Sequence, residues 1–304
     1  MKFSVFQLSR KGGRKNNEDR MGYCYSSAAA IFLLADGMGG HPQGEVAAEL
    51  ALQVMASMFE EDAKPELPDV GAFLTAAVMA AHRQILRHAG RAKMFDSPRT
   101  TIVAAVLQGG MVSWIHCGDS RLYLVRQGKL LARTRDHSFA ERHPAAGVVL
   151  KLPKRINRNV LFTCLGSPIK PVLELTGPQV LHQGDRLLLC SDGLWSSLSE
   201  DDIAFQLSQK PVSQAVPDLV ETALLKAGTR GDNVTALALE WETPDPASPE
   251  GNRISMDVLH VDFFASTFQS DLSEPVAEAM DEASMERSVA EINASIRRAA
   301  ARKA

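Results

Sequence analysis

The chain of 304 residues lacks several features that mark other classes of protein. Its four cysteines are scattered and form no CxxC pair, so we expect neither a disulfide framework nor a cysteine zinc site. No apolar run reaches membrane-spanning length, and the start of the chain has no apolar core of signal-peptide length. A net charge of -3 implies no basic surface for nucleic acid. We therefore expect a cytoplasmic protein with no membrane and no nucleic-acid partner.

Common catalytic signatures are also missing. The sequence contains no GxxxxGK[ST] phosphate loop, no cysteine-nucleophile signature and no Ser-His-Asp arrangement. What is present is the composition of a soluble globular protein, with 45% hydrophobic and 23% charged residues. The length is sufficient for one large domain or two ordinary ones. The chemistry must therefore come from other polar residues.

The strongest local signal lies in the segment IFLLADGMGGH, residues 31–41. Its first five residues are apolar and predict a strand buried on both faces. Asp36 follows, and then a turn with three glycines, which tolerate positive φ and close approach of a ligand. A carboxylate at the end of a buried strand is costly to desolvate alone, so we expect a cation or hydrogen-bond donors beside it. The alternative is an Asp that caps the next helix or braces the turn.

The same arrangement returns further along the chain. Asp119 follows the apolar run MVSWIHC and Asp192 follows RLLLC, each beside a glycine, and Asp232 precedes the last predicted strand. Carboxylates that are held together repel one another unless cations or protons compensate. Oxygen ligands without His or Cys favour Mg²⁺ or Mn²⁺ over zinc. The residues alone leave two interpretations open: one shared metal centre, or unrelated turn braces.

A polar loop near the start, KGGRKNNEDR, contributes further charged residues. Arg14 offers a planar guanidinium that binds phosphate oxygens through two hydrogen bonds, and Glu18 and Asp19 follow it closely. Two hard ions about 3.5–4 Å apart can activate water and stabilise in-line displacement at phosphorus. The predicted chemistry is hydrolysis of a phosphate ester, and the plain alternative for the loop is a solvated turn.

Hydrophobic periodicity and turn residues predict the remaining elements. We expect strands within 4–8, 21–27, 100–107, 111–126, 128–136, 159–166 and 186–190, helices at 44–60, 70–89 and within 200–228, and a last strand after Asn233. Residues 139–159 contain two prolines and a glycine with weak periodicity, which indicates an excursion or flap outside the sheet.

Seven short motifs, taken in chain order, resemble those of the metal-dependent, type 2C family of Ser/Thr protein phosphatases, with the spacing of its compact bacterial branch. They are RKNNED (14–19), DGMGGH (36–41), RTT (99–101), GDSR (118–121), DHS (136–138), SDGLW (191–195) and DNVT (232–235). Each motif alone is weak, but all of them in order are specific. The resemblance implies an α+β fold, a four-layer αββα sandwich of two antiparallel β-sheets flanked by helix pairs, followed by a C-terminal extension.

The resemblance also implies a ligand set for two Mn²⁺ or Mg²⁺ ions. Asp36 would bridge the two ions, and the Gly37 carbonyl would bind one of them. Asp192 and Asp232 would hold the other ion. Asp119, together with Asp192, matches the position of a third and weaker metal in bacterial members.

Other site residues follow from the same likeness. Arg14 would bind the substrate phosphate, and Glu18 and Asp19 would orient metal-bound waters. Eukaryotic members carry a His directly after the DG pair as general acid, but this chain has Met38 there, as in bacterial relatives. A metal-bound water, or His41, is left as the acid, and we rank water first.

The chain divides into a catalytic domain at 1–241, a proline-containing linker at 242–253 and an extension at 254–304. The extension begins with an apolar, strand-like stretch and continues as a predicted helix whose apolar stripe does not hold phase. It is either a tail of the catalytic domain or a docking or dimerisation segment. Truncation at Pro246 with unchanged oligomeric state and partner binding would remove the second interpretation.

The function implied by this resemblance is removal of phosphate from phosphoserine or phosphothreonine in proteins, in opposition to a bacterial Ser/Thr kinase. Two alternatives are a catalytically silent regulatory binding module and a phosphatase for a small phosphorylated metabolite. Retention of every metal-ligand position, and of Arg14, disfavours the silent module.

Overall fold

The computed structural model describes residues 1–138, 160–244 and 268–271. Its strands are β1 (Phe3–Arg10), β2 (Asp19–Tyr25), β3 (Ala29–Asp36), β4 (Ile102–Gln108), β5 (Met111–Cys117), β6 (Arg121–Arg126), β7 (Lys129–Arg133), β8 (Glu174–Val180), β9 (Arg186–Cys190), β10 (Val234–Trp241) and β11 (Phe268–Asp271). Its α-helices are α1 (Gly44–Asp62), α2 (Val70–Arg91), α3 (Asp192–Trp195), α4 (Glu200–Gln209) and α5 (Val212–Ala227). None of the helices in these ranges is both long and apolar enough to cross a membrane.

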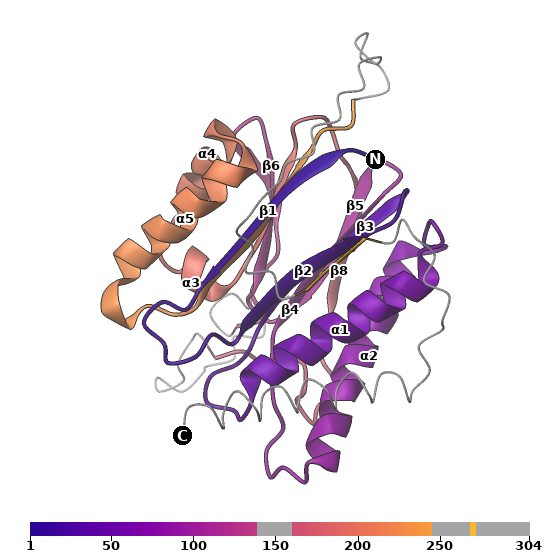
Figure 1. The fold of residues 1–304 in the computed structure, drawn as a ribbon, viewed down its shortest axis with the longest axis vertical. Coiled ribbons are helices and arrows are strands. Elements are labelled where there is room, and N and C mark those ends of the chain that lie inside the picture. Colours follow the sequence, from indigo (N-terminus) through magenta and orange to yellow (C-terminus); the bar gives the residue numbers. More distant parts are fainter. Residues whose placement is uncertain (139–159, 245–267, 272–304) are drawn as a thin grey trace, which may run out of the picture.

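Two sheets pack face to face, and helices cover the outer face of each (Figure 1). One sheet has the strand order β1-β10-β9-β6-β7, with every neighbouring pair antiparallel. The other has the order β11-β2-β3-β4-β5-β8, in which only β11 runs parallel to its neighbour. Helices α1 and α2 lie on the second sheet, and α3, α4 and α5 lie on the first. The predicted αββα sandwich is confirmed.

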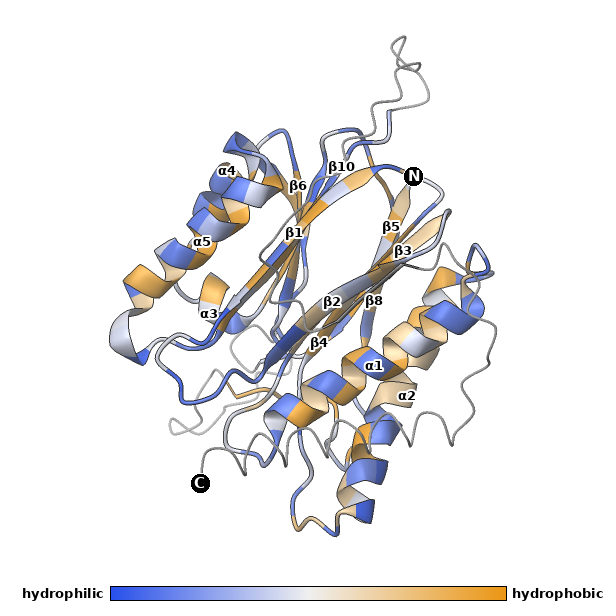
Figure 2. Cartoon of the chain, viewed as in Figure 1, coloured by the Kyte–Doolittle hydropathy of each residue, from blue (hydrophilic) through white to orange (hydrophobic). Residues whose placement is uncertain are grey.

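The alternation of side chains along β3 explains why its apolar run is continuous. Ile31 and Leu33 pack against α1 and α2, whereas Phe32 and Leu34 point into the space between the two sheets. Each of these side chains is fully buried, because both faces of the strand contact another layer. Figure 2 shows the consequence: hydrophobic residues concentrate along the strands and alternate with hydrophilic ones along the covering helices.

The chain crosses between the sheets at one of the predicted site positions. We expected residues 111–126 to form one β-type run, but β5 belongs to one sheet and β6 to the other. The turn at 118–120 makes the crossing, and Gly118 has a φ of 114° there, which favours glycine. Asp119 is thereby placed at the junction of the two sheets.

Several other elements differ from the prediction. The run at 159–166 forms no strand over its described residues; Leu161 and Leu165 make only isolated bridges. Helix α3 and strands β8 and β11 were not predicted. The predicted flap at 139–159 and most of the C-terminal extension lie outside the described residues. The proposed domain boundaries at 241 and 253 therefore stay predictions, although β10 does end at Trp241.

Candidate active site

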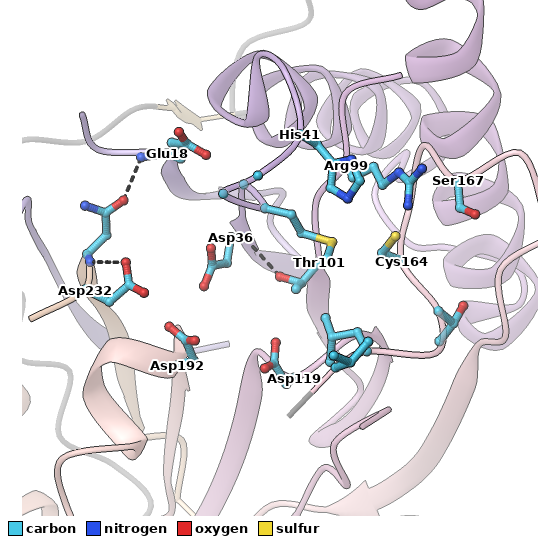
Figure 3. A pocket seen from close by; sticks show the side chains of 18 of the residues that line it. Glu18, Asp36, His41, Arg99, Thr101, Asp119, Cys164, Ser167, Asp192 and Asp232 are labelled. Atoms are coloured by element: carbon cyan, nitrogen blue, oxygen red, sulfur yellow. Dashed lines mark hydrogen bonds between the residues drawn. The ribbon is translucent and has the colours of Figure 1, made fainter. Parts of the chain in front are cut away.

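The predicted aspartates meet where strand ends of the two sheets come together. Asp36 ends β3, Asp119 follows β5, Asp192 begins α3 and is separated by one residue from the end of β9, and Asp232 precedes β10. Their carboxylates, with that of Glu18, face a common space (Figure 3). All five residues line one pocket of about 800 Å³. The structure thus gathers residues that lie up to 214 positions apart in the sequence, from Glu18 to Asp232.

The electrostatics show how strongly these carboxylates act on one another. Burial raises the pKa of Asp36 well above its ordinary value, and the charges of Asp19, Asp192 and Asp119 raise it further. Burial and then the charge of Asp119 raise the pKa of Asp192 to about 8. Burial, followed by the charge of Asp136, raises the pKa of Asp119 to about 6. Such a cluster is stable in its charged form only with compensating cations.

The backbone around Asp36 is fixed by the RTT motif. The Asp36 N–H donates to Thr101 Oγ1 at 3.0 Å, and Thr100 Oγ1 donates to the Asp36 carbonyl at 2.8 Å. The next residue has no room for a side chain, because a Cβ on Gly37 would lie 2.5 Å from the backbone of Gly44. The glycine therefore allows the turn to pack directly on the start of α1, in the position that puts Asp36 in the pocket.

Asn233 connects the N-terminal loop to the loop that carries Asp232, and its role was not predicted. Its side-chain carbonyl accepts from the Glu18 N–H at 2.9 Å, and its amide donates to the carbonyls of Lys11 and Asn16 at 2.8 and 2.9 Å. Asn233 is part of the DNVT motif, but its hydrogen bonds to residues more than 200 positions away leave no pattern in the sequence from which they could be predicted.

Arg14 lies on the wall of the same pocket, as expected for a phosphate-binding residue. One of its guanidinium nitrogens, Nη2, donates to Asp232 Oδ2 at 2.5 Å. The Arg14 side chain is 55% exposed, so the guanidinium is reachable from the open pocket. A guanidinium has further N–H groups beyond the one bonded to Asp232, and two of them on one edge can donate to two oxygens of a phosphate.

The donors that line the pocket fit divalent ions. Within the described part of the chain, Glu18 Oε2 and Asp19 Oδ1 are buried side-chain oxygens without a hydrogen-bond partner. Buried polar atoms are normally paired, so these oxygens indicate places for ordered waters around a cation. The donor set is all oxygen, and it fits Mn²⁺ or Mg²⁺.

Arg121, Asp136 and Trp195 come from three of the motifs and hold Asp119 in place without lining the pocket themselves. Arg121 forms two hydrogen bonds of 2.8 Å to the buried Asp136, which joins GDSR to DHS. The Arg121 guanidinium lies 3.7 Å from the ring centroid of Trp195, a cation–π contact. The indole N–H of Trp195 donates to the Asp119 carbonyl at 2.9 Å. Residues of these motifs outside the proposed ligand set thus fix the position of Asp119.

His41 is part of a separate polar chain at the far wall of the pocket. Its Nδ1 lies 2.7 Å from Asp96 Oδ2, and the other oxygen of Asp96 accepts from Arg99 at 3.1 Å. The Met38 N–H donates to the Arg99 carbonyl at 2.9 Å. These contacts join His41 to Arg99, which also holds the glycine turn at Met38, and His41 borders the pocket.

Two helix-covered antiparallel sheets with buried carboxylates at their junction are the architecture of a metal-dependent phosphatase. The chain belongs to the protein phosphatase 2C family, whose family model matches residues 9–224. This is a family of metal-dependent Ser/Thr protein phosphatases.

The chain is similar to several characterised bacterial proteins. The serine/threonine protein phosphatase PstP of Mycobacterium tuberculosis is 33% identical over 230 residues, which are 75% of this chain and 42% of PstP. The chain thus spans only about two fifths of the length of PstP. The serine/threonine phosphatase stp of Listeria welshimeri is 30% identical over 241 residues, 77% of this chain and 94% of that protein.

A solved structure adds information on metal ions in a relative. The catalytic domain of PstP, crystallised in complex with two manganese ions, matches this chain with a TM-score of 0.63 at 33% identity. The match covers 78% of this chain and 97% of that domain. Its two ions support the two-metal cofactor expected for this chain.

Proposed function

We propose that this protein hydrolyses phosphoserine and phosphothreonine in other proteins with the help of two Mn²⁺ or Mg²⁺ ions. The observation that carries the proposal is the convergence of Asp36, Asp119, Asp192 and Asp232 on one pocket, where burial and neighbouring carboxylates raise the pKa of Asp36. A chain that folds carboxylates together against their mutual repulsion is expected to bind cations there. The family of the chain then selects phosphate-ester hydrolysis among the reactions of a two-ion centre.

The proposed ligands are the residues that converge on the pocket. Asp36 would contribute to both ion sites, and the carbonyl of Gly37 would contribute to one of them. Asp192 and Asp232 would hold the second ion, and Asp119 with Asp192 would form a weaker third site. This assignment is supported by the charge of Asp192, which helps to raise the pKa of Asp36, and by the charges of Asp119 and Asp232, which help to raise that of Asp192.

The remaining polar residues position the reactants. When bound, the two ions supply an activated water nucleophile and neutralise charge on the phosphate. Arg14 binds the phosphate oxygens with the edge of its guanidinium that faces the pocket, and so aligns the ester for in-line attack. Glu18 and Asp19 accept hydrogen bonds from waters at the centre, through the oxygens that have no protein partner. Met38 cannot donate a proton to the leaving alkoxide, so a water in the pocket is the proposed acid.

A comparison of substrates tests this function. Release of phosphate from a phosphothreonine peptide and from an aryl phosphate is measured with Mn²⁺ and with excess chelator. We expect Mn²⁺-dependent hydrolysis of the peptide, and none with chelator. Folded protein without activity on either substrate would favour the regulatory binding module. Activity on small phosphorylated metabolites alone would favour the metabolite phosphatase.

The wider role of the protein is a further part of the proposal. A phosphoprotein phosphatase of this family is expected to oppose a Ser/Thr kinase, and phosphorylated protein is then its partner. The docking role of the extension at 254–304 stays a prediction, tested by truncation at Pro246 and measurement of oligomeric state. The cytoplasmic location also stays a prediction from the sequence.

A further inference from the structure

A second group of metal-ligating side chains lies apart from the carboxylates of the pocket. His116 on β5, His137 after β7 and Glu174 at the start of β8 each offer one ligand atom, and these atoms all lie within 4.8 Å of one another. His116 and Glu174 are register partners in the antiparallel β5–β8 pair, so their side chains leave the sheet on the same face. The ring of His137 is stacked on that of His116 at a centroid distance of 4.5 Å.

The ring of His116 is oriented as metal-binding histidines commonly are. Its Nε2 lies 2.7 Å from the carbonyl oxygen of Arg135, and because a carbonyl only accepts, Nε2 carries the proton. Nδ1 therefore has the free lone pair, and this atom is buried without a hydrogen-bond partner. The whole residue is 1% exposed. Donation of the second ring nitrogen to a backbone carbonyl is a typical support for a ligating imidazole.

The other two side chains complete a set of three donors. His137 Nε2 lies 3.8 Å from Glu174 Oε2, which is close enough for both to contact one ion but too far for a hydrogen bond between them. The Nδ1 of His137 accepts a long bond, 3.3 Å, from the Gly118 N–H. Ligation through Nε2 requires the ring proton to move to Nδ1, and because that proton would face the Gly118 N–H, the ring must also turn away from Gly118. Burial lowers the pKa of His116 and lowers that of His137 to about 4, which keeps both rings in the neutral form that binds metals.

We propose that His116, His137 and Glu174 form a binding site for Zn²⁺. Two imidazoles and one carboxylate are a donor set of zinc sites with three protein ligands and an open fourth position, whereas Mg²⁺ prefers oxygen alone. Bonds of about 2.0–2.2 Å place the donors of a tetrahedral ion roughly 3.4 Å apart. The site must therefore contract on binding. The Glu174 side chain is 48% exposed and can move inward, and His137 turns out of its stacked position.

The position of the site connects it to the pocket. The His137 N–H donates to the Gly118 carbonyl at 2.9 Å, and the His137 carbonyl accepts from the Phe162 N–H at 2.9 Å. Gly118 precedes Asp119, and Phe162 lines the pocket. An ion held by His137 thus restrains the turn that carries Asp119. The zinc site does not depend on the proposed phosphatase activity, since its ligands are separate from the carboxylate centre.

Zinc binding to the full chain in excess Mg²⁺ tests the proposal. The excess Mg²⁺ occupies oxygen sites, and bound Zn²⁺ is then measured by titration against a chromophoric chelator. We expect Glu174→Gln to remove one equivalent of zinc or to weaken its binding about tenfold or more. The matched control Glu61→Gln changes an exposed carboxylate at the end of α1, and should bind zinc as the wild type does. Because Glu174 is exposed, its variant is expected to fold, which thermal unfolding checks.

Two further variants separate this site from the carboxylate centre. Asp192→Asn should keep the zinc equivalent that Glu174→Gln loses, whereas His116→Asn should lose it. Mn²⁺-dependent phosphate release by Glu174→Gln should equal that of the wild type, so that the two proposals fail independently. Wild-type zinc stoichiometry and affinity in Glu174→Gln would overturn the site. Loss of the same equivalent in Asp192→Asn would overturn it as well.

Discussion

Asp19 and Asp36 are register partners in the antiparallel pair of β2 and β3, so two carboxylates lie directly opposite each other on neighbouring strands. Like charges in such a position destabilise a sheet. Burial raises the pKa of both carboxyls, and the charge of Asp19 is the next largest cause for Asp36. Ser191 Oγ donates to Asp19 Oδ2 at 2.8 Å, which offsets part of this repulsion. A bound cation would offset the rest, and this is the physical basis of the proposed centre.

Asp192→Asn should abolish turnover without unfolding the chain. The substitution keeps the shape of the side chain but removes a charge from a buried cluster in which that charge is unfavourable without metal. We therefore expect a melting temperature in chelator that equals or exceeds that of the wild type at pH 8. Phosphate release and thermal unfolding on the same samples check both parts. Loss of the folded state, or retained Mn²⁺-dependent turnover, would contradict the assignment of this residue.

Without metal, the stability of the wild type should fall as pH rises. The folded-state pKa values of Asp119 and Asp192 are raised from 3.8 to about 6 and about 8, so the folded protein binds protons more tightly than the unfolded chain. Their contribution to stability is complete below pH about 4 and is lost as pH rises through these values. Urea unfolding in chelator at pH 5.5 and pH 8.5 measures this. Asp192→Asn is the control and should reduce the difference; an unchanged difference would exclude Asp192 as its source.

Arg14→Ala should mainly raise KM. The guanidinium binds substrate phosphate in the proposed mechanism, and its exposed ion pair with Asp232 contributes roughly 1 kcal/mol or less to folding. Arg14→Lys keeps the charge but not the planar fork, and should recover only part of the lost affinity. Steady-state kinetics with a phosphothreonine peptide provide the measurement. A large loss confined to kcat would contradict a binding role.

Gly37→Ala should weaken binding of Mn²⁺ and lower the melting temperature. A Cβ at this position would lie 2.5 Å from the backbone of Gly44 and 2.8 Å from the Glu18 carbonyl, so the turn that carries Asp36 has to shift. Gly39→Ala is the matched control in the same turn, because its Cβ would meet only Arg14 Nη1, at an ordinary 3.8 Å. Calorimetric titration with Mn²⁺ compares the two variants. Equal affinities in both would show that Gly37 is not needed for the geometry.

The part of the fold that could be predicted is the part with strong periodicity. The continuous apolar run at 31–35 indicates a strand covered on both faces, and β3 is such a strand. The apolar residues at 44–60 and 70–89 recur at helical spacing, and these segments form α1 and α2. Strand β8 could not be found in this way, since it is an exposed edge strand with Gly177 and Pro178 inside it. The pairing of β11 with β2 joins residues that are far apart in the chain, and no local pattern encodes such a contact.

The candidate site was predictable because each aspartate repeats one local arrangement at a strand end. The contacts that bring these ends together were not predictable. The crossing of the chain between sheets at Gly118 resembles an ordinary hairpin turn in the sequence. Asn233 and Trp195 act through hydrogen bonds to backbone carbonyls of distant residues, which depend on tertiary structure alone. The zinc-type donors His116 and Glu174 likewise become neighbours only when β5 pairs with β8.

The most direct test of the proposed centre is diffraction from crystals grown with Mn²⁺, with anomalous scattering recorded at the manganese edge. We expect two manganese peaks about 3.5–4 Å apart, both in contact with the Asp36 carboxylate, and one of them also bound by Asp192 and Asp232. Manganese found only away from Asp36, or a pocket in which these three carboxylates bind no ion, would contradict it.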